Sequence, residues 1–241
     1  MSGELGGRVI AVTGATGGIG RALCLAAAAQ GAELVLLARN ERKLRALHEE
    51  LERLAPGAAL MAPLDLEKAL ASDYDRIADA IEQRYGRLDG LVHCAALLGT
   101  LTPIELYEMA TWCRVMHVNV TAAFALSQVL LPVLKRAPDP GVIFTSSSVG
   151  RKGRAHWGAY AVSKFAIEGL AQVMADELES AGVRVNTVNP GPARTLMRRQ
   201  AYPSENLESV PLPETLVQPY LNLLGPGGAG VTGQALNCQP G

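Results

Sequence analysis

The sequence predicts an α/β fold in which a parallel sheet of about seven strands carries helices on both faces. Three observations lead to this fold class. Short runs rich in β-branched residues alternate with longer segments of helical spacing along the whole chain. Strands separated by helices cannot pair as hairpins, so they lie parallel and are joined by right-handed crossovers. The 241 residues are 49% hydrophobic and 19% charged, which excludes a disordered chain and fits one folded domain over residues 1–241.

The predicted strands are the β-branched runs, and the predicted helices lie between them. Strand candidates stand at residues 8–13, 34–37, 60–64, 91–94, 142–145, 183–188 and 235–238. An alanine-rich helix is expected at residues 21–30. Residues 41–54 have leucines at steps of three and four among charged side chains, which predicts an amphipathic helix against the sheet. Residues 77, 81 and 85 continue the helical spacing in the next segment. Together these elements predict a single doubly wound, Rossmann-type domain, whose ligands bind beyond the carboxyl ends of the strands.

Two further segments are long and apolar. Residues 111–134 and 159–179 predict helices that need partners to cover them. Within the first, residues 120–134 form the longest apolar stretch. It is too short and too polar to span a bilayer, so it predicts a buried helix. The proline- and glycine-rich stretch 190–226 is interpreted as an irregular excursion before the last strand.

Charge and cysteine usage exclude several classes of function. The chain has 22 Lys+Arg against 23 Asp+Glu, so nucleic acid is not an expected partner. Residues 1–7 are polar and lack the features of a secretory signal, which favours the cytoplasm. The four cysteines have no CxxC spacing, which indicates free thiols. Two Cys/His pairs, Cys113 with His117 and His93 with Cys94, lack acidic partners, so we interpret them as core residues and expect no metal site.

A glycine-rich turn follows the first strand. Gly14, Gly18 and Gly20 have the spacing GxxxGxG, with Thr16 and Ile19 between them, and a helix follows. Glycines permit a tight strand-to-helix turn and let a pyrophosphate approach backbone N–H groups at the helix N-terminus. The spacing is neither GxGxxG nor a P-loop, so a tight turn without a ligand stands beside the cofactor interpretation.

Two residues after the next strands bear on the choice of cofactor. Where an NAD site places an acid against the ribose, this sequence has Ala38 followed by Arg39, which favours the 2′-phosphate of NADP. A solvated Arg39 at a helix start is the alternative, although a cation is disfavoured there. Asp65 follows the third strand and is suited either to an adenine amino group or to capping the next helix.

A phenol and an ammonium lie one helical turn apart in YAVSK, at Tyr160 and Lys164. A cation about 4 Å away stabilises a phenolate by about 4 kcal/mol in a partly wet site, which brings the pKa of a tyrosine from about 10 toward neutrality. Such a tyrosine exchanges a proton at physiological pH. Residues 145–148 offer hydroxyls for a carbonyl oxygen at the end of the fifth strand. A surface Tyr/Lys pair and capping serines are the alternatives.

The order and spacing of these motifs resemble the classical short-chain dehydrogenase/reductase family over essentially the whole chain, and in particular its YciK-like bacterial oxidoreductase branch. The motifs are TGATGGIG, LD, HVNV, SSS, YAVSK, NPGPART and VTG. The resemblance implies that Tyr160 is the acid/base and that Lys164 binds the nicotinamide ribose and lowers the pKa of the tyrosine. Ser147 is the implied substrate-orienting hydroxyl, with Ser146 as the fallback. Asn119 matches the residue that anchors a water near the lysine, and a helix kink is its alternative.

The resemblance also assigns the residues around the nicotinamide, which are Pro190, Gly191 and Thr195. One departure stands out, because the family has NNAG after the fourth strand and residues 93–96 here read HCAA. We expect Cys94 and Ala95 to line the cofactor site, with fewer polar partners at the strand ends. The change leaves the proton-transfer residues intact, so catalysis is still expected.

The sequence therefore predicts an NADP(H)-dependent oxidoreductase that interconverts a carbonyl and a secondary alcohol by hydride transfer. A catalytically weak, NADP(H)-binding sensor or scaffold on the same fold is the alternative. A nucleotide-sugar epimerase is a further rival, but only 46 residues follow Thr195 for its substrate domain. The substrate is a small molecule, with a pocket expected from residues 97–99, 150–157 and 197–213. The family implies a homodimer or homotetramer built through the long apolar helices.

Overall fold

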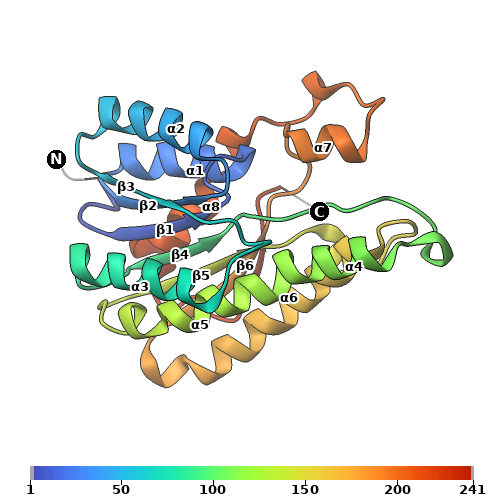
Figure 1. The fold of residues 1–241 in the computed structure, drawn as a ribbon. Helices are drawn as coiled ribbons and strands as arrows, with labels where there is room; N and C mark the ends of the chain where they lie inside the picture. Colours follow the sequence, from blue (N-terminus) through green and yellow to red (C-terminus); the bar gives the residue numbers. More distant parts are fainter. Residues whose placement is uncertain (1–2, 240–241) are drawn as a thin grey trace.

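Seven parallel strands form one sheet in the order β3-β2-β1-β4-β5-β6-β7, which confirms the predicted fold class (Figure 1). The structure is a computed structural model that describes residues 3–239, so the first two residues of the expected N-terminal segment 1–7 lie outside it. The strands are β1 Val9–Thr13, β2 Glu33–Ala38, β3 Ala59–Pro63, β4 Gly90–His93, β5 Gly141–Thr145, β6 Arg184–Asn189 and β7 Ala235–Asn237. Each lies within two residues of its predicted bounds. The strand order reverses between β1 and β4, where ligands of doubly wound sheets bind.

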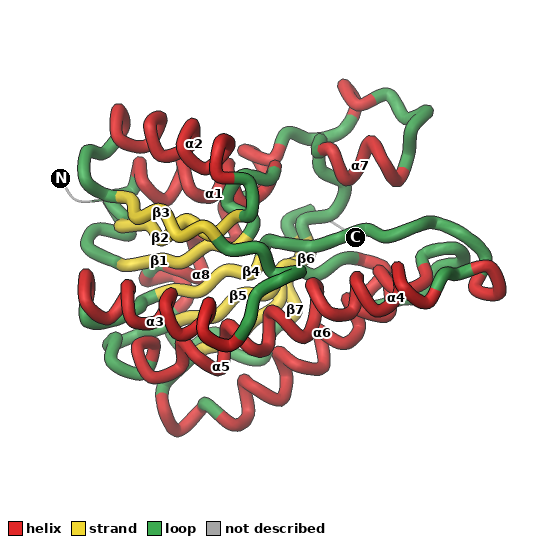
Figure 2. Tube along the Cα trace, in the orientation of Figure 1, coloured by secondary structure: helices red, strands yellow, loops and turns green. Residues whose placement is uncertain are grey.

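Helices cover both faces of the sheet, as Figure 2 shows. On one face lie α1 (Gly18–Ala29), α2 (Glu41–Leu54) and α8 (Gln218–Leu224), which share a core with alternate residues of β1 and β2. On the other face lie α3 (Ala71–Tyr85), α5 (Ala122–Leu134) and α6 (Gly158–Glu177). Because both faces are covered, every residue of β1 is buried, as expected for a central parallel strand.

The second helix begins and ends where its leucine pattern predicts. Leu44, Leu47 and Leu51 are buried against the sheet. Asn40 caps the helix N-terminus, because its side-chain oxygen accepts a hydrogen bond of 2.9 Å from the backbone N–H of Lys43. The local sequence and the tertiary contacts therefore agree at this element.

The long apolar helix is interrupted once. The helix α4 (Met109–Met116) runs into a π-helical turn at His117–Thr121, and α5 follows. The whole run, Met109–Leu134, is apolar and long enough by composition to cross a membrane, but half of its most apolar window is buried inside the fold. This burial is what a core helix requires. A π-turn inserts one residue into the helical ladder and often marks a functional site, and here it contains Asn119.

The stretch 190–226 is more ordered than its composition suggests, so the interpretation of an irregular excursion is wrong in part. It contains α7 (Leu196–Ala201) and α8. Tyr220, Leu221 and Leu224 of α8 are buried against the sheet, and this packing stabilises a helix of seven residues. The proline of α8 stands in its first turn, where a missing N–H costs no hydrogen bond.

Candidate active site

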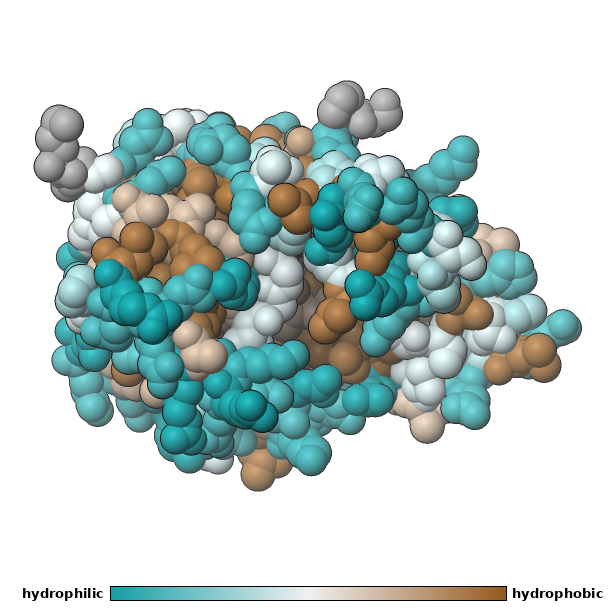
Figure 3. All heavy atoms as spheres, turned by 90° about the horizontal axis from the view of Figure 1, so that it is seen from above, coloured by the Kyte–Doolittle hydropathy of each residue, from teal (hydrophilic) through white to brown (hydrophobic). Residues whose placement is uncertain are grey.

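A cavity of about 790 Å³ opens at the carboxyl ends of the strands. Its glycine-turn end lies over the turn after β1 and beside Arg39. Its tyrosine end lies among Tyr160, Trp157 and Tyr202. Figure 3, seen from the side of α7, shows apolar side chains at the floor of a hollow in the middle of the molecule. The volume is within the range of small-molecule and cofactor sites.

The glycine turn is built for close packing as well as for an open cavity. Gly14 has a φ of +67°, and a Cβ there would lie 2.8 Å from the backbone nitrogen of Ala95. Gly20 faces the carbonyl of Gly14 so closely that a side chain would collide with it. The cavity is lined by the predicted residues Gly14, Thr16, Gly18, Ile19 and Gly20. The backbone of the α1 N-terminus therefore borders a space large enough for an anion.

The residues expected to determine the preference for NADP(H) or NAD(H) lie at the glycine-turn end of the cavity. The Arg39 side chain is 59% exposed, and its nearest carboxylate oxygen, on Glu67, lies 3.8 Å away. Arg114 binds the same Glu67 at 2.8 Å. Arg39 is therefore weakly paired and lines the cavity. Asp65 also lines it, and its Oδ1 accepts a hydrogen bond of 3.2 Å from the backbone N–H of Glu67. Asp65 thus caps this turn with one oxygen, and the adenine contact stays a prediction.

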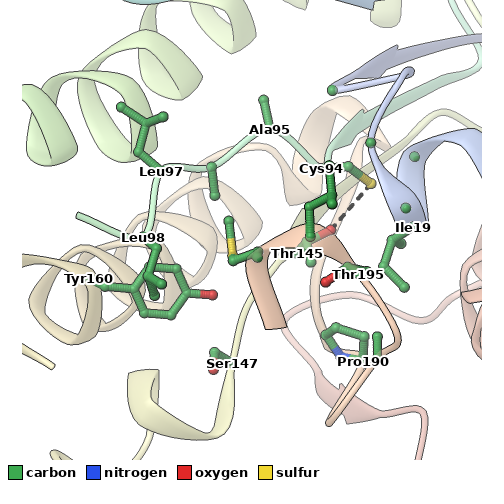
Figure 4. A pocket seen from close by; sticks show the side chains of 18 of the residues that line it. Ile19, Cys94, Ala95, Leu97, Leu98, Thr145, Ser147, Tyr160, Pro190 and Thr195 are labelled. Atoms are coloured by element: carbon green, nitrogen blue, oxygen red, sulfur yellow. Dashed lines mark hydrogen bonds between the residues drawn. The ribbon is translucent and has the colours of Figure 1, made fainter. Parts of the chain in front are cut away.

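The catalytic candidates meet at the tyrosine end, on two neighbouring elements. Tyr160 and Lys164 are buried on α6, and Ser147 follows β5. Figure 4 shows the Tyr160 hydroxyl pointing into the cavity, with Ser147 beside it. The Lys164 Nζ lies 5.6 Å from the centroid of the Tyr160 ring and donates a hydrogen bond of 2.7 Å to the carbonyl of Thr145. A buried, cavity-lining pair does not fit the alternative of a surface Tyr/Lys pair.

The prediction that the pKa of Tyr160 is shifted toward neutrality is wrong for the protein without a bound cofactor. Burial raises the pKa of Tyr160 to about 12, and the nearby Ser147 hydroxyl lowers it by less. Burial also lowers the pKa of Lys164 to about 8, because an ammonium loses its hydration, while Cys94 and Glu168 act in the opposite direction. A tyrosine pKa near neutrality requires a partly wet site with the cation beside the phenol oxygen. Here both groups are shielded from water, and the ammonium is directed at a carbonyl instead of the phenol oxygen.

Asn119 connects two elements of the site. Its Oδ1 accepts a hydrogen bond of 2.7 Å from the Leu97 N–H, and its Nδ2 donates to the Leu97 carbonyl at 2.9 Å and to Ser163 Oγ at 3.0 Å. Asn119 therefore ties the loop after β4 to α6, beside the tyrosine. The alternative of a helix kink is also present, since the residue stands in the π-turn. The implied water contact stays a prediction.

The departure at residues 93–96 has polar partners of its own. The Nε2 of His93 lies 2.8 Å from Ser127 Oγ, and its ring stacks on Phe144 with centroids 4.7 Å apart. Burial, and then the charge of Lys164, lower the pKa of His93 to about 3, so the ring is neutral at neutral pH. The Cys94 Sγ accepts a hydrogen bond of 3.4 Å from Thr145 Oγ1. Cys94 and Ala95 line the cavity as expected.

The turn after β6 also lines the cavity. Gly191 has a φ of +71°, and Gln239 Nε2 donates to the carbonyls on either side of it, those of Pro190 at 2.7 Å and Pro192 at 2.8 Å. Thr195 caps α7 by accepting a hydrogen bond of 3.1 Å from the Arg198 N–H. Its methyl group faces Gly18 so closely that the glycine has no room for a side chain. The turn and α7 are thereby held against the glycine turn.

A buried carboxylate beneath the catalytic residues was missed by the sequence analysis. Glu168 follows Tyr160 and Lys164 at steps of four on α6, which was the available signal. Its Oε1 accepts from Ser146 Oγ at 2.5 Å and from Arg151 Nε at 3.0 Å, and its Oε2 accepts from Thr187 Oγ1 at 2.7 Å. The Ser146 hydroxyl is therefore engaged, which favours Ser147 over the fallback.

A second missed residue lies behind the cavity. Tyr220 on α8 is fully buried, and its hydroxyl donates a hydrogen bond of 3.1 Å to Thr145 Oγ1. Thr145 thereby joins Tyr220, Cys94 and Lys164 through its side chain and its carbonyl. Because α8 was not expected from the sequence, nothing indicated this contact.

A doubly wound sheet with a glycine turn, a serine after β5 and a Tyr/Lys pair on one helix defines a class of nicotinamide-dependent oxidoreductases. Residues 8–206 match the model of the short chain dehydrogenase family, and the chain belongs to this family.

Several relatives resemble the chain over nearly its whole length. It is 43% identical over 237 residues to the uncharacterized oxidoreductase YciK of Escherichia coli K12, which covers 98% of this chain and 94% of that protein. The structure of a short chain dehydrogenase from Pseudomonas syringae is 51% identical, has a TM-score of 0.97 and covers 99% of this chain and 97% of its own. A short chain dehydrogenase from Shigella flexneri, crystallised with NADP, is 42% identical with a TM-score of 0.97 and covers 100% of both chains.

Proposed function

We propose that the protein is an NADP(H)-dependent oxidoreductase that interconverts a carbonyl compound and a secondary alcohol, with residues 1–241 acting as one catalytic domain. One observation carries the proposal. The Tyr160 hydroxyl, Ser147 and Lys164 meet at one end of a cavity whose other end is bordered by the glycine turn and Arg39. A proton donor and an anion site in one cavity are what a nicotinamide reductase requires.

The residues of the glycine-turn end fit NADP(H). The backbone at Gly18 and Ile19 would bind the pyrophosphate at the helix N-terminus. Arg39 is exposed, weakly paired and suited to the 2′-phosphate, and no acid stands at Ala38 to repel that group. The Shigella flexneri relative, crystallised with NADP, supports this choice. When bound, NADPH supplies the hydride for the carbonyl carbon.

The chain's own residues handle the oxygen of the substrate. Because the pKa of Tyr160 is raised to about 12, its hydroxyl is protonated at neutral pH and ready to donate a proton as an alkoxide forms. Ser147 orients the same oxygen with a hydrogen bond. Lys164, held by the Thr145 carbonyl, binds the ribose and directs a cation toward this end of the cavity.

The test of catalysis is the loss of turnover without loss of cofactor binding. Tyr160→Phe and Ser147→Ala should abolish NADPH oxidation with a panel of aldehydes, ketones, quinones and 3-oxoacyl thioesters, while NADPH titrations stay near wild type. Tyr85→Phe is the matched control, because Tyr85 ends α3, away from the cavity lining. Unchanged turnover in Tyr160→Phe would remove this tyrosine from the reaction.

The test of cofactor choice uses a pair of arginines. Arg39→Ala should narrow the preference for NADPH over NADH, because the 2′-phosphate loses its cation. Arg42→Ala removes the same charge from an exposed position on α2 outside the cavity lining, so it should leave the ratio unchanged. An identical ratio in Arg39→Ala and wild type would show that Arg39 is only a surface residue.

The sensor or scaffold alternative depended on the HCAA segment. That segment has its own hydrogen bonds, and Ser147, Tyr160 and Lys164 line one cavity, which supports the enzyme over the sensor.

Oligomerisation through the outer helices is the remaining part of the proposal. Four large apolar side chains are between 42% and 54% exposed on α5 and α6: Phe124, Val162, Phe165 and Val173. Large exposed apolar groups on neighbouring helices are typical of interfaces between identical subunits. A homodimer or homotetramer is expected by light scattering, and Phe165→Glu should lower its mass. The cytoplasmic location stays a prediction.

A further inference from the structure

The tyrosine end of the cavity has apolar walls. Leu98, Val149 and Tyr160 belong to a small buried cluster, against which Trp157, Met197 and Ala201 pack. The Trp157 ring centroid lies 5.8 Å from that of Tyr160 and 6.0 Å from that of Tyr202. A substrate whose carbonyl reaches Tyr160 therefore passes along an indole before it leaves the cavity.

The charges that line the cavity are divided between its ends. Its acidic lining residues within the described chain, Asp65 and Glu67, stand at the glycine-turn end. Arg154 and Arg198 line the tyrosine end, together with Lys164, whose ammonium is hydrogen-bonded to the Thr145 carbonyl. Arg198 is matched by Glu205, which accepts from its Nε at 2.7 Å and its Nη2 at 2.5 Å. This ion pair neutralises Arg198. Of the two arginines, only Arg154 therefore contributes a charge that no carboxylate matches.

The Arg154 guanidinium is held in place without an acid. Its Nη1 donates a hydrogen bond of 2.6 Å to the Tyr202 hydroxyl, and its Cζ lies 5.8 Å and 5.7 Å from the ring centroids of Trp157 and Tyr202. Across residues 3–239, no carboxylate comes within 4 Å of it, and its Nε and Nη2 have no hydrogen-bond partner. That edge of an arginine binds an oxyanion through two parallel hydrogen bonds.

We propose that Arg154 binds an anionic group of the substrate, so that the enzyme reduces carbonyl compounds carrying a carboxylate or a phosphate. This inference rests on the proposed function. The Trp157 ring is a neighbour of both groups, because its centroid is 5.8 Å from both the Arg154 Cζ and the Tyr160 centroid, so we place an apolar segment of the substrate against this ring, between its carbonyl and its anionic group. Trp157 and Met197 contact that segment, and Tyr202 positions the guanidinium.

Matched ketones, whose reduction gives secondary alcohols, test the anion requirement. NADPH oxidation is measured with 4-acetylbenzoate, 4-acetylphenyl phosphate and the neutral methyl 4-acetylbenzoate. The wild type should prefer one or both anions over the ester in kcat/KM. Arg154→Gln should lower that preference by about 10- to 100-fold, the range of hydrogen bonds to a charged group. Arg154→Lys should restore part of it as a point charge. Arg199→Gln, on exposed α7 surface outside the cavity lining, is the charge-matched control and should keep the preference.

The outcomes distinguish a failure of the anion site from a failure of the proposed function. Equal use of ester and anions by the wild type, or an unchanged preference in Arg154→Gln, overturns the anion site and leaves the reductase intact. If no carbonyl is reduced, the proposed function fails. Calorimetric titration of terephthalate into the NADP-loaded protein then decides the anion site alone. Binding that is lost in Arg154→Gln and kept in Arg199→Gln supports it, and no binding, or equal binding, overturns it.

Discussion

The buried His93 at the end of β4 makes the stability of the fold depend on pH. A single substitution of this residue measures its contribution. His93 is 5% exposed and stacked on Phe144, and its pKa falls from 6.5 to about 3. The unfolded chain binds a proton at this residue below about pH 6.5, whereas the folded chain does not until about pH 3. Since the unfolded state binds more protons in this window, stability falls as the pH falls through it.

The magnitude follows from the proton linkage. Each pH unit below 6.5 costs about 1.4 kcal/mol, so lowering the pH from 7 to 5 costs about 2 kcal/mol at this residue. For a chain of this length, 1 kcal/mol moves Tm by about 2–4 °C, so the contribution is about 4–8 °C. His93→Asn carries no titrating ring. Its Tm should be lower than wild type at pH 7, because the stacking is lost, but should fall less between pH 7 and 5.

The assay is a pair of thermal melts at pH 7 and pH 5, with the same buffers for both proteins. His156→Asn, at an exposed position with a φ of +72° that asparagine tolerates, is the matched control. If wild type and His93→Asn lose the same Tm between the two pH values, burial does not hold this ring neutral and the reasoning is refuted.

Three further predictions concern buried contacts. Glu168→Ala leaves the Ser146 and Thr187 hydroxyls and the Arg151 Nε without their acceptor and should lower stability by about 3 kcal/mol. Glu177→Ala, exposed on the same helix, should leave the melt nearly unchanged, and equal melts of the two variants would contradict this. Gly14→Ala should cost about 1–3 kcal/mol and weaken NADPH in titrations, because it combines a φ of +67° with a close approach to Ala95. A variant that binds NADPH as wild type would show that the turn adapts. At Asp139, burial raises the pKa, but hydrogen bonds from Arg184 and Arg8 lower it further, to a net value below its usual range. Its stabilisation is therefore complete above about pH 4 and is lost as the pH falls below that. The stability gap to Asp139→Asn, followed by urea unfolding, should shrink in acid, and a constant gap would exclude this ion pair.

Local pattern was sufficient for much of the fold. Residues 41–54 form a helix over the predicted range because their leucine spacing and their cap are both local features. The strands β1, β5 and β6 follow from β-branched runs that are almost wholly buried. The short helix α8 was not predictable in this way. It is stabilised by the burial of its own Tyr220 against residues that are distant in sequence.

In the candidate site, too, local motifs were predictable from the sequence, whereas contacts between distant residues were not. The glycine turn and the pair Tyr160 and Lys164 are short-range motifs, and the structure brings them to one cavity. The direction of the Lys164 ammonium on α6 depends on the carbonyl of Thr145 at the end of β5, and the environment of Glu168 depends on three separate segments of the chain. Sequence spacing carries no information on such partners. The pKa of Tyr160 differed from expectation because burial, which spacing does not report, raises it by more than the Ser147 hydroxyl lowers it.

The different environments of the four thiols have a practical consequence for labelling the protein. Burial raises the pKa of the thiols at Cys24, Cys94 and Cys238, the last two to about 11, so they stay protonated and unreactive at neutral pH. Cys113 is exposed on α4. A maleimide fluorophore should therefore attach at this one position and leave the thiol inside the cavity untouched. The native sequence thus provides a site-selective handle for following substrate binding by fluorescence.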